Sequence, residues 1–308
     1  MQDKYNVMEK KMKKISVLVL TLFLIAIVSP AFSTEALKKN LIPEEAKWVV
    51  HIDVEKFAQT HFKEVFMEKS HFPLGREIFG IEKTANINFF EDIVAVTFIG
   101  MINGDEPVIA FSGNLNKDHL LGLLKKEEHE EIQHGQFLIY NWGNNEYGAF
   151  ISDRLLVISE NRHDLEKVLD TFAGKAKSIS GTLDSKLKSV SPHAFIFAAA
   201  DNISEMVKDE DDFPSQILQK TESLFFAASE QGNTLKLVLN LQTDSPTTAK
   251  NLVDMAQGLK AFLAMSDKVD PEWDLLKNMN ISIKGNAVLV ESESSPEGLL
   301  KVLLGMKF

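Results

Sequence analysis

Trp48–Val54, with the sequence WVVHIDV, is the stretch from which the fold of this chain is best inferred. Its β-branched and aromatic residues predict a strand, and apolar residues at helical spacing over residues 55–68 predict a helix directly after it. A second apolar stretch, Ala194–Ala200, also follows a proline and is expected to be a strand. The same order of elements therefore begins twice in the chain.

Each of these strands is followed by a hairpin, a helix and further strands. In the first half the expected elements are strands over Ile93–Gly100, Pro107–Leu115, Gln136–Trp142, Tyr147–Ser152 and Leu155–Ser159, a helix after Asn116, and a closing helix over Asp164–Phe172. In the second half they are a helical part within Ser204–Thr221, strands over Leu224–Ser229, Thr234–Leu241, Asn280–Lys284 and Ala287–Glu291, and helices starting at Ser245-Pro246 and Ser295-Pro296.

This order predicts an α+β fold made of two tandem repeats, each an antiparallel sheet covered by helices on one face. The expected boundaries are 34–178 for the first repeat and 179–308 for the second, with the junction in the Lys/Ser/Gly-rich stretch Gly174–Lys188. Two arrangements remain open. Either each half buries its own core, or a single long sheet crosses both halves.

Residues 1–33 have the pattern of a secretory signal peptide. Five lysines precede an apolar run, Ile15–Val28, whose 14 residues fall short of the roughly 18 to 20 that a membrane-spanning helix needs. Pro30 and small residues then predict cleavage near Ser33. We therefore expect an exported protein, periplasmic or extracellular, with no membrane span in the mature chain.

The composition excludes several classes of function. The chain has no cysteine, so it has no disulfide, thiol nucleophile or thiolate metal site. Only three of its 33 basic residues are arginine, and removal of residues 1–33 would leave 28 basic and 42 acidic residues. An acidic, arginine-poor protein repels phosphate backbones, so nucleic acid is not expected as a partner.

One short motif carries a resemblance. Pro43, Ala46, Val49, Ile52 and Asp53 form a Pro-x-x-Ala-x-x-Val-x-x-Ile-Asp opening after the signal peptide. It resembles the opening of uncharacterised exported proteins of the bacterial envelope. The resemblance implies an envelope location and a similar repeated strand and helix order, and it implies no activity.

His51 and Asp53 are the first candidate site residues. They lie two apart on the first expected strand and so share one face, where a His–Asp pair can act as a base with its orienting group. Catalysis also needs a nucleophile, and no Gly-x-Ser-x-Gly motif occurs. A polar outer face, or Asp53 capping the next helix, is therefore the favoured interpretation.

Motifs for metals and nucleotides are incomplete. His129 and His134 are five residues apart, whereas a zinc-binding helix needs a spacing of four. The favoured interpretation of residues 125–131 is a solvated helix end and loop. Neither Gly-x-Gly-x-x-Gly nor a phosphate-binding loop is present, so we expect no metal and no cofactor.

Aromatic residues are the remaining candidates for ligand contact. They are Trp142, Phe262 on the long helix that starts at Pro246, and Trp273. Core packing is the favoured role of such residues, with an apolar pocket or a protein-contact groove as the alternative.

The expected function is non-catalytic binding, or a structural or interaction role, in the bacterial envelope. One alternative is a carrier of an apolar small molecule or lipid between helices and sheet, and a second is an unrecognised hydrolase. The partner is then a protein or an apolar ligand that the sequence does not identify.

Overall fold

The computed structural model describes residues 37–69, 87–101, 106–124, 129–142, 145–207, 213–265 and 278–305. The expected signal peptide, residues 1–33, lies outside the described residues, and so does Trp273. No helix among the described residues is both long and apolar enough to cross a membrane.

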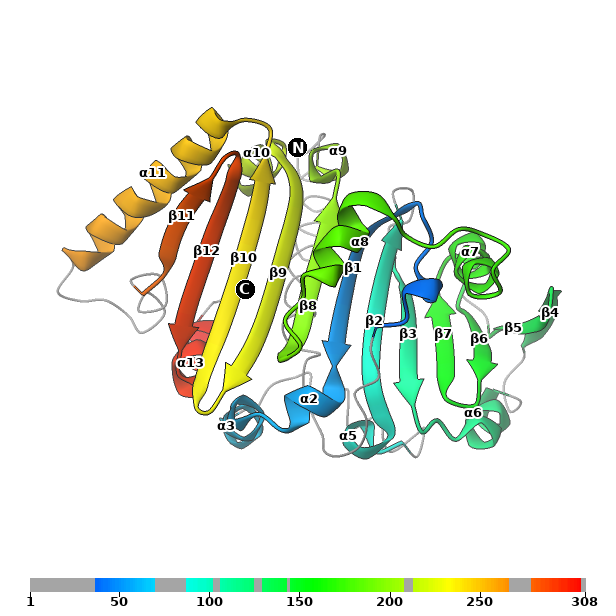
Figure 1. Cartoon of the computed structure of the whole chain (residues 1–308). Helices are drawn as coiled ribbons and strands as arrows, with labels where there is room; N and C mark the ends of the chain where they lie inside the picture. Colours follow the sequence, from blue (N-terminus) through cyan, green and yellow to red (C-terminus); the bar gives the residue numbers. More distant parts are fainter. Residues whose placement is uncertain are drawn as a thin grey trace, which may run out of the picture.

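The described strands form one antiparallel sheet (Figure 1). The first half contributes β1 (Ala46–Asp53), β2 (Ile93–Met101), β3 (Val108–Gly113), β4 (Glu130–His134), β5 (Phe137–Asn141), β6 (Tyr147–Ser152) and β7 (Leu155–Ser159). The second half contributes β8 (Ala194–Asp201), β9 (Thr221–Gln231), β10 (Thr234–Thr243), β11 (Asn280–Lys284) and β12 (Ala287–Ser294). Their order in the sheet is β11-β12-β10-β9-β8-β1-β2-β3-β7-β6-β5-β4. The expectation of an α+β fold with antiparallel pairing is thus confirmed.

The helices connect the strands and pack on them. They are η1 (Lys39–Leu41), α2 (Val54–Ala58), α3 (His61–Lys69), α5 (Phe89–Asp92), α6 (Lys117–Leu124), α7 (Arg162–Phe172), α8 (Gly181–Lys188), α9 (Ile203–Met206), α10 (Phe213–Leu218), α11 (Pro246–Ala264) and α13 (Pro296–Gly305). Several begin where the sequence predicts. The Asn116 side chain accepts a hydrogen bond from the His119 amide (3.1 Å), and Ser245 accepts one from the Thr248 amide (3.1 Å).

The two halves meet at the pair β1–β8. Trp48 to Ile52 pair in antiparallel register with Ala200 to Ile196, which places the blue strand beside the green one in the middle of Figure 1. Of the two arrangements left open by the sequence, the structure has the single long sheet. Without this pairing, one edge of β1 and one edge of β8 would have no strand partner.

Both faces of the sheet are buried at its centre. Neighbouring residues of β1 point to opposite faces, and Val49 and Val50 belong to two different hydrophobic clusters. The cluster around Val49 includes side chains of η1, α7 and α8, and the cluster around Val50 includes those of α2, α3 and α13. Helices therefore pack on both faces, where the sequence pattern predicts them on one face. The difference arises because β1, β2 and β8 are apolar on both sides.

The expected single helix over residues 55–68 is two helices. Thr60 separates them: its hydroxyl donates to the Phe57 carbonyl (2.6 Å) and accepts from the Lys63 amide (3.2 Å), which ends α2 and caps α3. The apolar spacing continues across the break, so the sequence pattern conceals it.

Helix α3 also joins the two halves. The carboxylate of Glu230, at the end of β9, accepts hydrogen bonds from the backbone amides of His61 (2.7 Å) and Phe62 (3.0 Å). A carboxylate at this position satisfies two amides of the first turn and interacts favourably with the helix dipole. The His61 ring also lies 3.4 Å from the Glu297 carboxylate of α13. Polar contacts therefore reinforce the apolar packing between the halves.

The junction stretch Gly174–Lys188 is more ordered than its composition indicates. Its second half forms α8, which buries Leu183 and Leu187 against the sheet. With only two large apolar residues in eight, this helix carries a weak sequence signal. Its position on the sheet creates the site described next.

Candidate functional site

His51 lies in the core at the centre of the sheet. It is 4% exposed, its Nδ1 lies 2.8 Å from the Thr97 hydroxyl in a hydrogen bond, and its ring packs on Phe197 with centroids 5.0 Å apart. Burial, with a smaller effect of the Lys56 charge, lowers the pKa of His51 to about 3. The imidazole is therefore neutral over the physiological pH range and satisfied within the core.

Asp53 interacts with Lys56 and not with His51. Its carboxylate accepts a hydrogen bond from the Lys56 backbone amide (2.8 Å) and pairs with the Lys56 ammonium (2.8 Å). It is thus the N-cap of α2, the role that the sequence favours. Although His51 and Asp53 share a strand, each is engaged by a different partner.

The aromatic candidates do not come together. Trp142 follows β5, and its indole N–H donates to the Glu146 carboxylate. Its ring lies against Gly148 of β6, where a Cβ atom would be 2.7 Å from the ring. Phe262 of α11 is 71% exposed. Trp142 therefore packs on its own strand pair. Phe262 lies on the surface of α11, so the core role favoured for it from the sequence is wrong.

His129 and His134, the two histidines of the incomplete metal motif, contact different groups. Residues 130–134 form strand β4, not the helix end and loop expected for residues up to 131. The His134 ring contacts the carboxylates of Asp170 (3.0 Å) and Glu166 (3.6 Å) on α7, while the His129 ring lies near Tyr140. His129 lies just before the first residue of β4, whereas His134 is its last residue.

The strongest candidate site is a cleft between α8 and the ends of three strands. Thr182, Ser185 and Lys186 line it from α8, and Ser189 lines it from the C-cap of that helix. Their spacing of three, four and seven residues places them on one side of α8, while Leu183 and Leu187 pack into the core. The helix thus turns a polar stripe toward the cleft because its apolar pair is anchored on the sheet.

Strand register assembles the floor of this cleft. Ser223 of β9 is paired with Asp201 of β8 on one side and with Gln242 of β10 on the other, so one row crosses three strands. Glu222 completes the lining. The volume is about 360 Å³, within the lower part of the range for small-molecule sites. Every side chain that lines it is polar or charged.

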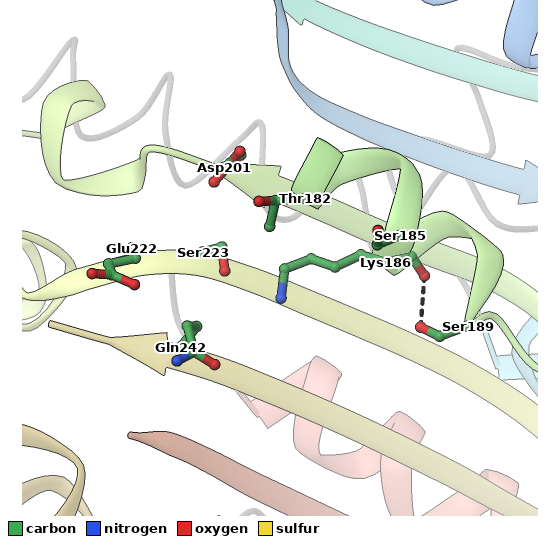
Figure 2. A pocket seen from close by; sticks show the side chains of 8 residues that line it. All are labelled: Thr182, Ser185, Lys186, Ser189, Asp201, Glu222, Ser223 and Gln242. Atoms are coloured by element: carbon green, nitrogen blue, oxygen red, sulfur yellow. Dashed lines mark hydrogen bonds between the residues drawn. The ribbon is translucent and has the colours of Figure 1, made fainter. Parts of the chain in front are cut away.

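Lys186 extends from α8 into the cleft, and its amino group points across β9 toward Ser223 and Gln242 (Figure 2). Burial lowers the pKa of Lys186 below its ordinary value, and the Asp201 charge opposes this effect. Among the described residues, no hydrogen bond or ion pair holds the Lys186 ammonium group. A half-buried cation without such a partner is favourable only if something else solvates it.

Hydrogen bonds at the ends of β9 and β10 hold the floor of the cleft in place. Thr243, fully buried at the end of β10, donates its hydroxyl to the Asn286 carbonyl (2.8 Å), and the Asn286 side chain donates to the Thr243 carbonyl (2.9 Å). The Asp244 amide also donates to the Lys220 carbonyl (3.0 Å). These contacts fix the ends of β9 and β10 against the β11–β12 turn, so the positions of Ser223 and Gln242 are well defined.

A second cleft of about 290 Å³ lies near α5 and is lined by Ile87, Asp92, Asn114 and Asn116. Two of its polar side chains, Asp92 and Asn116, already accept hydrogen bonds from backbone amides. The Asp92 carboxylate accepts from the Asn88 amide (2.8 Å), and Asn116 caps α6. This cleft is therefore a weaker candidate than the one under α8.

The sequence matches no protein-family model and no curated protein. Its fold is similar to that of TP0453. Against crystal form III of TP0453 the TM-score is 0.51 at 12% sequence identity, covering 89% of this chain and 99% of that one. Against crystal form IV the TM-score is 0.53 at 14% identity, with 88% and 97% covered. The likeness extends over nearly the whole of both chains and concerns the fold alone.

Proposed function

We propose that this chain is an exported protein of the bacterial envelope that works by binding, without catalysis, and that the cleft under α8 holds its ligand. The observation that carries this proposal is the half-buried Lys186 ammonium group, aimed into a polar cleft of about 360 Å³. Folding leaves a charge in this position only at a cost, which a bound ligand offsets.

Two buried side chains support a non-catalytic role. His51 is neutral and bound to Thr97 inside the core, and Asp53 caps α2. Neither is available as a base next to a nucleophile, which makes the hydrolase alternative less favoured. The side chains that line the cleft under α8 are all polar or charged, which favours a polar ligand over the apolar cargo of the carrier alternative.

We also propose that the chain arose by duplication, as the order of its strands suggests, although the closing helices α7 and α13 pack on opposite faces of the sheet. From the central pair outward, the first half runs β1-β2-β3-β7-β6 and the second runs β8-β9-β10-β12-β11. In each half the third strand is followed by a helix, and the last strand of the half then returns to pair with that third strand. On this proposal β8–β10 correspond to β1–β3, and the cleft under α8 belongs to the second repeat.

Export makes a direct prediction about the mature N-terminus. The lysine-rich start, the short apolar run and the Ser33-Thr34 junction predict removal of residues 1–33. Intact-mass spectrometry of the protein from its producing cell should show a chain that begins near Thr34. An unprocessed chain in the cytoplasmic fraction would contradict the proposal.

Ligand binding in the cleft can be tested by thermal unfolding of residues 34–308. The probes are a polyol (glucose), an anion (propionate), a cation (ethylamine) and a zwitterion (L-alanine). A ligand at 100 times its Kd stabilises the native state by about 2.7 kcal/mol, which raises the Tm by several degrees. We expect at least one probe to do so.

A blocked variant identifies the site. Ser185→Trp places a large side chain in the cleft from an exposed position, and Lys188→Trp places the same side chain on α8 away from the cleft. The probe that stabilises the wild type should stabilise Lys188→Trp equally and leave Ser185→Trp unchanged. If no probe acts on the wild type, or if Ser185→Trp responds as the wild type does, the cleft is not the ligand site.

A further inference from the structure

We infer that the ligand is a small zwitterion, a molecule with a carboxylate and an ammonium group close together, such as a free amino acid. This inference rests on the proposed function, because it takes the cleft under α8 to be the ligand site. The signs and positions of the charged side chains that line the cleft support a zwitterion.

The cleft contains one positive and two negative groups. Lys186 is the only cation among its lining residues, and Asp201 and Glu222 are the anions. Figure 2 shows the Lys186 amino group between α8 and β9, near Ser223, with the two carboxylates on the strands beyond it. Opposite charges are thus presented from two sides of one small volume.

A ligand carboxylate fits the Lys186 side of this cleft. The ammonium group offers three donors, and the hydroxyl of Ser223 and the amide of Gln242 lie in the direction in which it points. Charge-assisted hydrogen bonds of this kind are stronger than those between neutral groups. A carboxylate here also removes the unfavourable burial of an unpaired cation.

A ligand ammonium group fits the other side. Asp201 uses one carboxylate oxygen to accept from the Asn202 amide (3.0 Å), which leaves the second oxygen free to accept from a ligand. Glu222, exposed at the start of β9, adds a second acceptor. A ligand ammonium group beside Asp201 is a favourable arrangement, because opposite charges attract.

Ligands with one kind of charge fit less well. A simple anion pairs with Lys186 but approaches two carboxylates, and a simple cation meets the reverse conflict. A neutral polyol leaves the lysine without a counter-charge in a volume from which it has displaced water. Only a zwitterion neutralises both sides, and the volume of about 360 Å³ limits it to a small one.

Two matched sets of probes test this inference by calorimetric titration. The first is L-alanine, propionate and ethylamine. The second is L-glutamine, 4-carbamoylbutanoate and 4-aminobutanamide. Within each set the second compound lacks the ammonium group and the third lacks the carboxylate. We expect at least one amino acid to bind at least about tenfold more tightly than both of its single-charge analogues.

Substitutions assign each charge. Lys186→Met should weaken binding of that amino acid at least about tenfold, and Lys186→Arg, which retains the charge, should recover part of the loss. At least one of Asp201→Asn and Glu222→Gln should weaken binding of the amino acid more than it weakens binding of the analogue that has only the carboxylate. Lys188→Met on the outer side of α8 is the control and should bind as the wild type does.

The same variants separate binding from folding. Because burial lowers the pKa of Lys186, the charged form is less favourable in the folded chain than in the unfolded one. Lys186→Met without ligand should therefore have a Tm no lower than that of the wild type. A lower Tm would indicate a structural role for the lysine and would contradict the inference.

The outcomes distinguish the inference from the function on which it rests. If propionate, ethylamine or glucose binds as tightly as the amino acids, and Ser185→Trp abolishes that binding, the cleft is a ligand site but not one for zwitterions. If none of the probes binds, both proposals fail. If an amino acid binds equally to Lys186→Met and to the wild type, the assignment of the carboxylate to Lys186 is wrong.

Discussion

Acidification from pH 6.5 to about 3 should destabilise the protein through His51 alone by up to about 5 kcal/mol. The unfolded chain binds a proton at this imidazole near pH 6.5, whereas the folded chain, with its pKa lowered to about 3, does not. Stability is therefore complete above the unfolded pKa and is lost as the pH falls, at about 1.4 kcal/mol per pH unit. Below about pH 3 both states bind the proton and the loss ends.

The variant His51→Gln isolates this effect. Glutamine does not titrate and keeps a group able to hydrogen bond with Thr97, the partner of His51 at 2.8 Å. The free energies of unfolding of wild type and variant, from urea titrations between pH 3 and 8, should differ by an amount that changes with pH. Carboxylates affect both proteins alike, so their contribution cancels in the difference.

His193→Gln is the matched control, because His193 is exposed in the turn before β8. Because this side chain is exposed to solvent, the difference from wild type should change much less with pH than it does for His51→Gln. If the His51→Gln difference changes as little with pH, the imidazole is not kept neutral by burial. His61 is expected to act in the opposite sense: its hydrogen bond to Glu64 raises its pKa, so its contribution is present below pH 6.5 and is lost as the pH rises.

Much of the sheet could be predicted from the sequence because local signals and tertiary structure agree there. The turn at Gly232–Asn233 and the turn at Gly285–Asn286 both lie between runs rich in β-branched or apolar residues, and both join paired strands in the structure. Asn116 and Ser245 begin helices as their side chains predict. Each of these features depends on a few consecutive residues.

Most features that the sequence did not reveal depend on contacts between distant parts of the chain. The break at Thr60 is an exception, because it is set by hydrogen bonds between residues three apart, which leave the apolar spacing unchanged. Helix α8 is short and is stabilised by the sheet beneath Leu183 and Leu187, not by its own propensity. Burial of both faces of β1 follows from its central place, which no local pattern specifies.

The cleft was missed for the same reason. Asp201, Ser223 and Gln242 belong to three strands and meet only through register. One signal was available: the polar residues at 182, 185, 186 and 189 form a helical stripe opposite Leu183 and Leu187. This stripe indicates a common face only if residues 181–188 form a helix, which the sequence does not clearly predict. By contrast, the spacing of His51 and Asp53 suggested a candidate site, whereas His51 is a buried core residue in the structure.

Replacing Gly100 by alanine should lower the free energy of unfolding by about 1 to 3 kcal/mol, the usual cost of an overpacked core. Gly100 of β2 is paired with Trp48 of β1, and a Cβ atom at this glycine would lie 1.9 Å from the indole ring. The nearest atoms belong to the rigid ring, so the whole Trp48 side chain has to move. Its packing against the cluster around Val50 is then lost.

Gly258→Ala is the matched control for this substitution. Gly258 lies within α11, where no atom comes within 4 Å of an added Cβ, so alanine should stabilise the helix by about 0.5 to 1 kcal/mol. The same chemical change thus has opposite signs at the two positions, which urea unfolding of both variants measures directly.

A double-mutant cycle then shows whether the indole is the cause. Trp48→Leu removes the ring that the new methyl group meets, so adding Gly100→Ala to Trp48→Leu should cost much less than adding it to the wild type. Equal costs in the two backgrounds would mean that the backbone of β2, and not the contact with Trp48, requires glycine. Because β1 pairs with both β2 and β8, loosening of Trp48 should also weaken the pairing that joins the two halves. Amide hydrogen exchange should therefore speed up in β8 as well as in β2 in the Gly100→Ala variant.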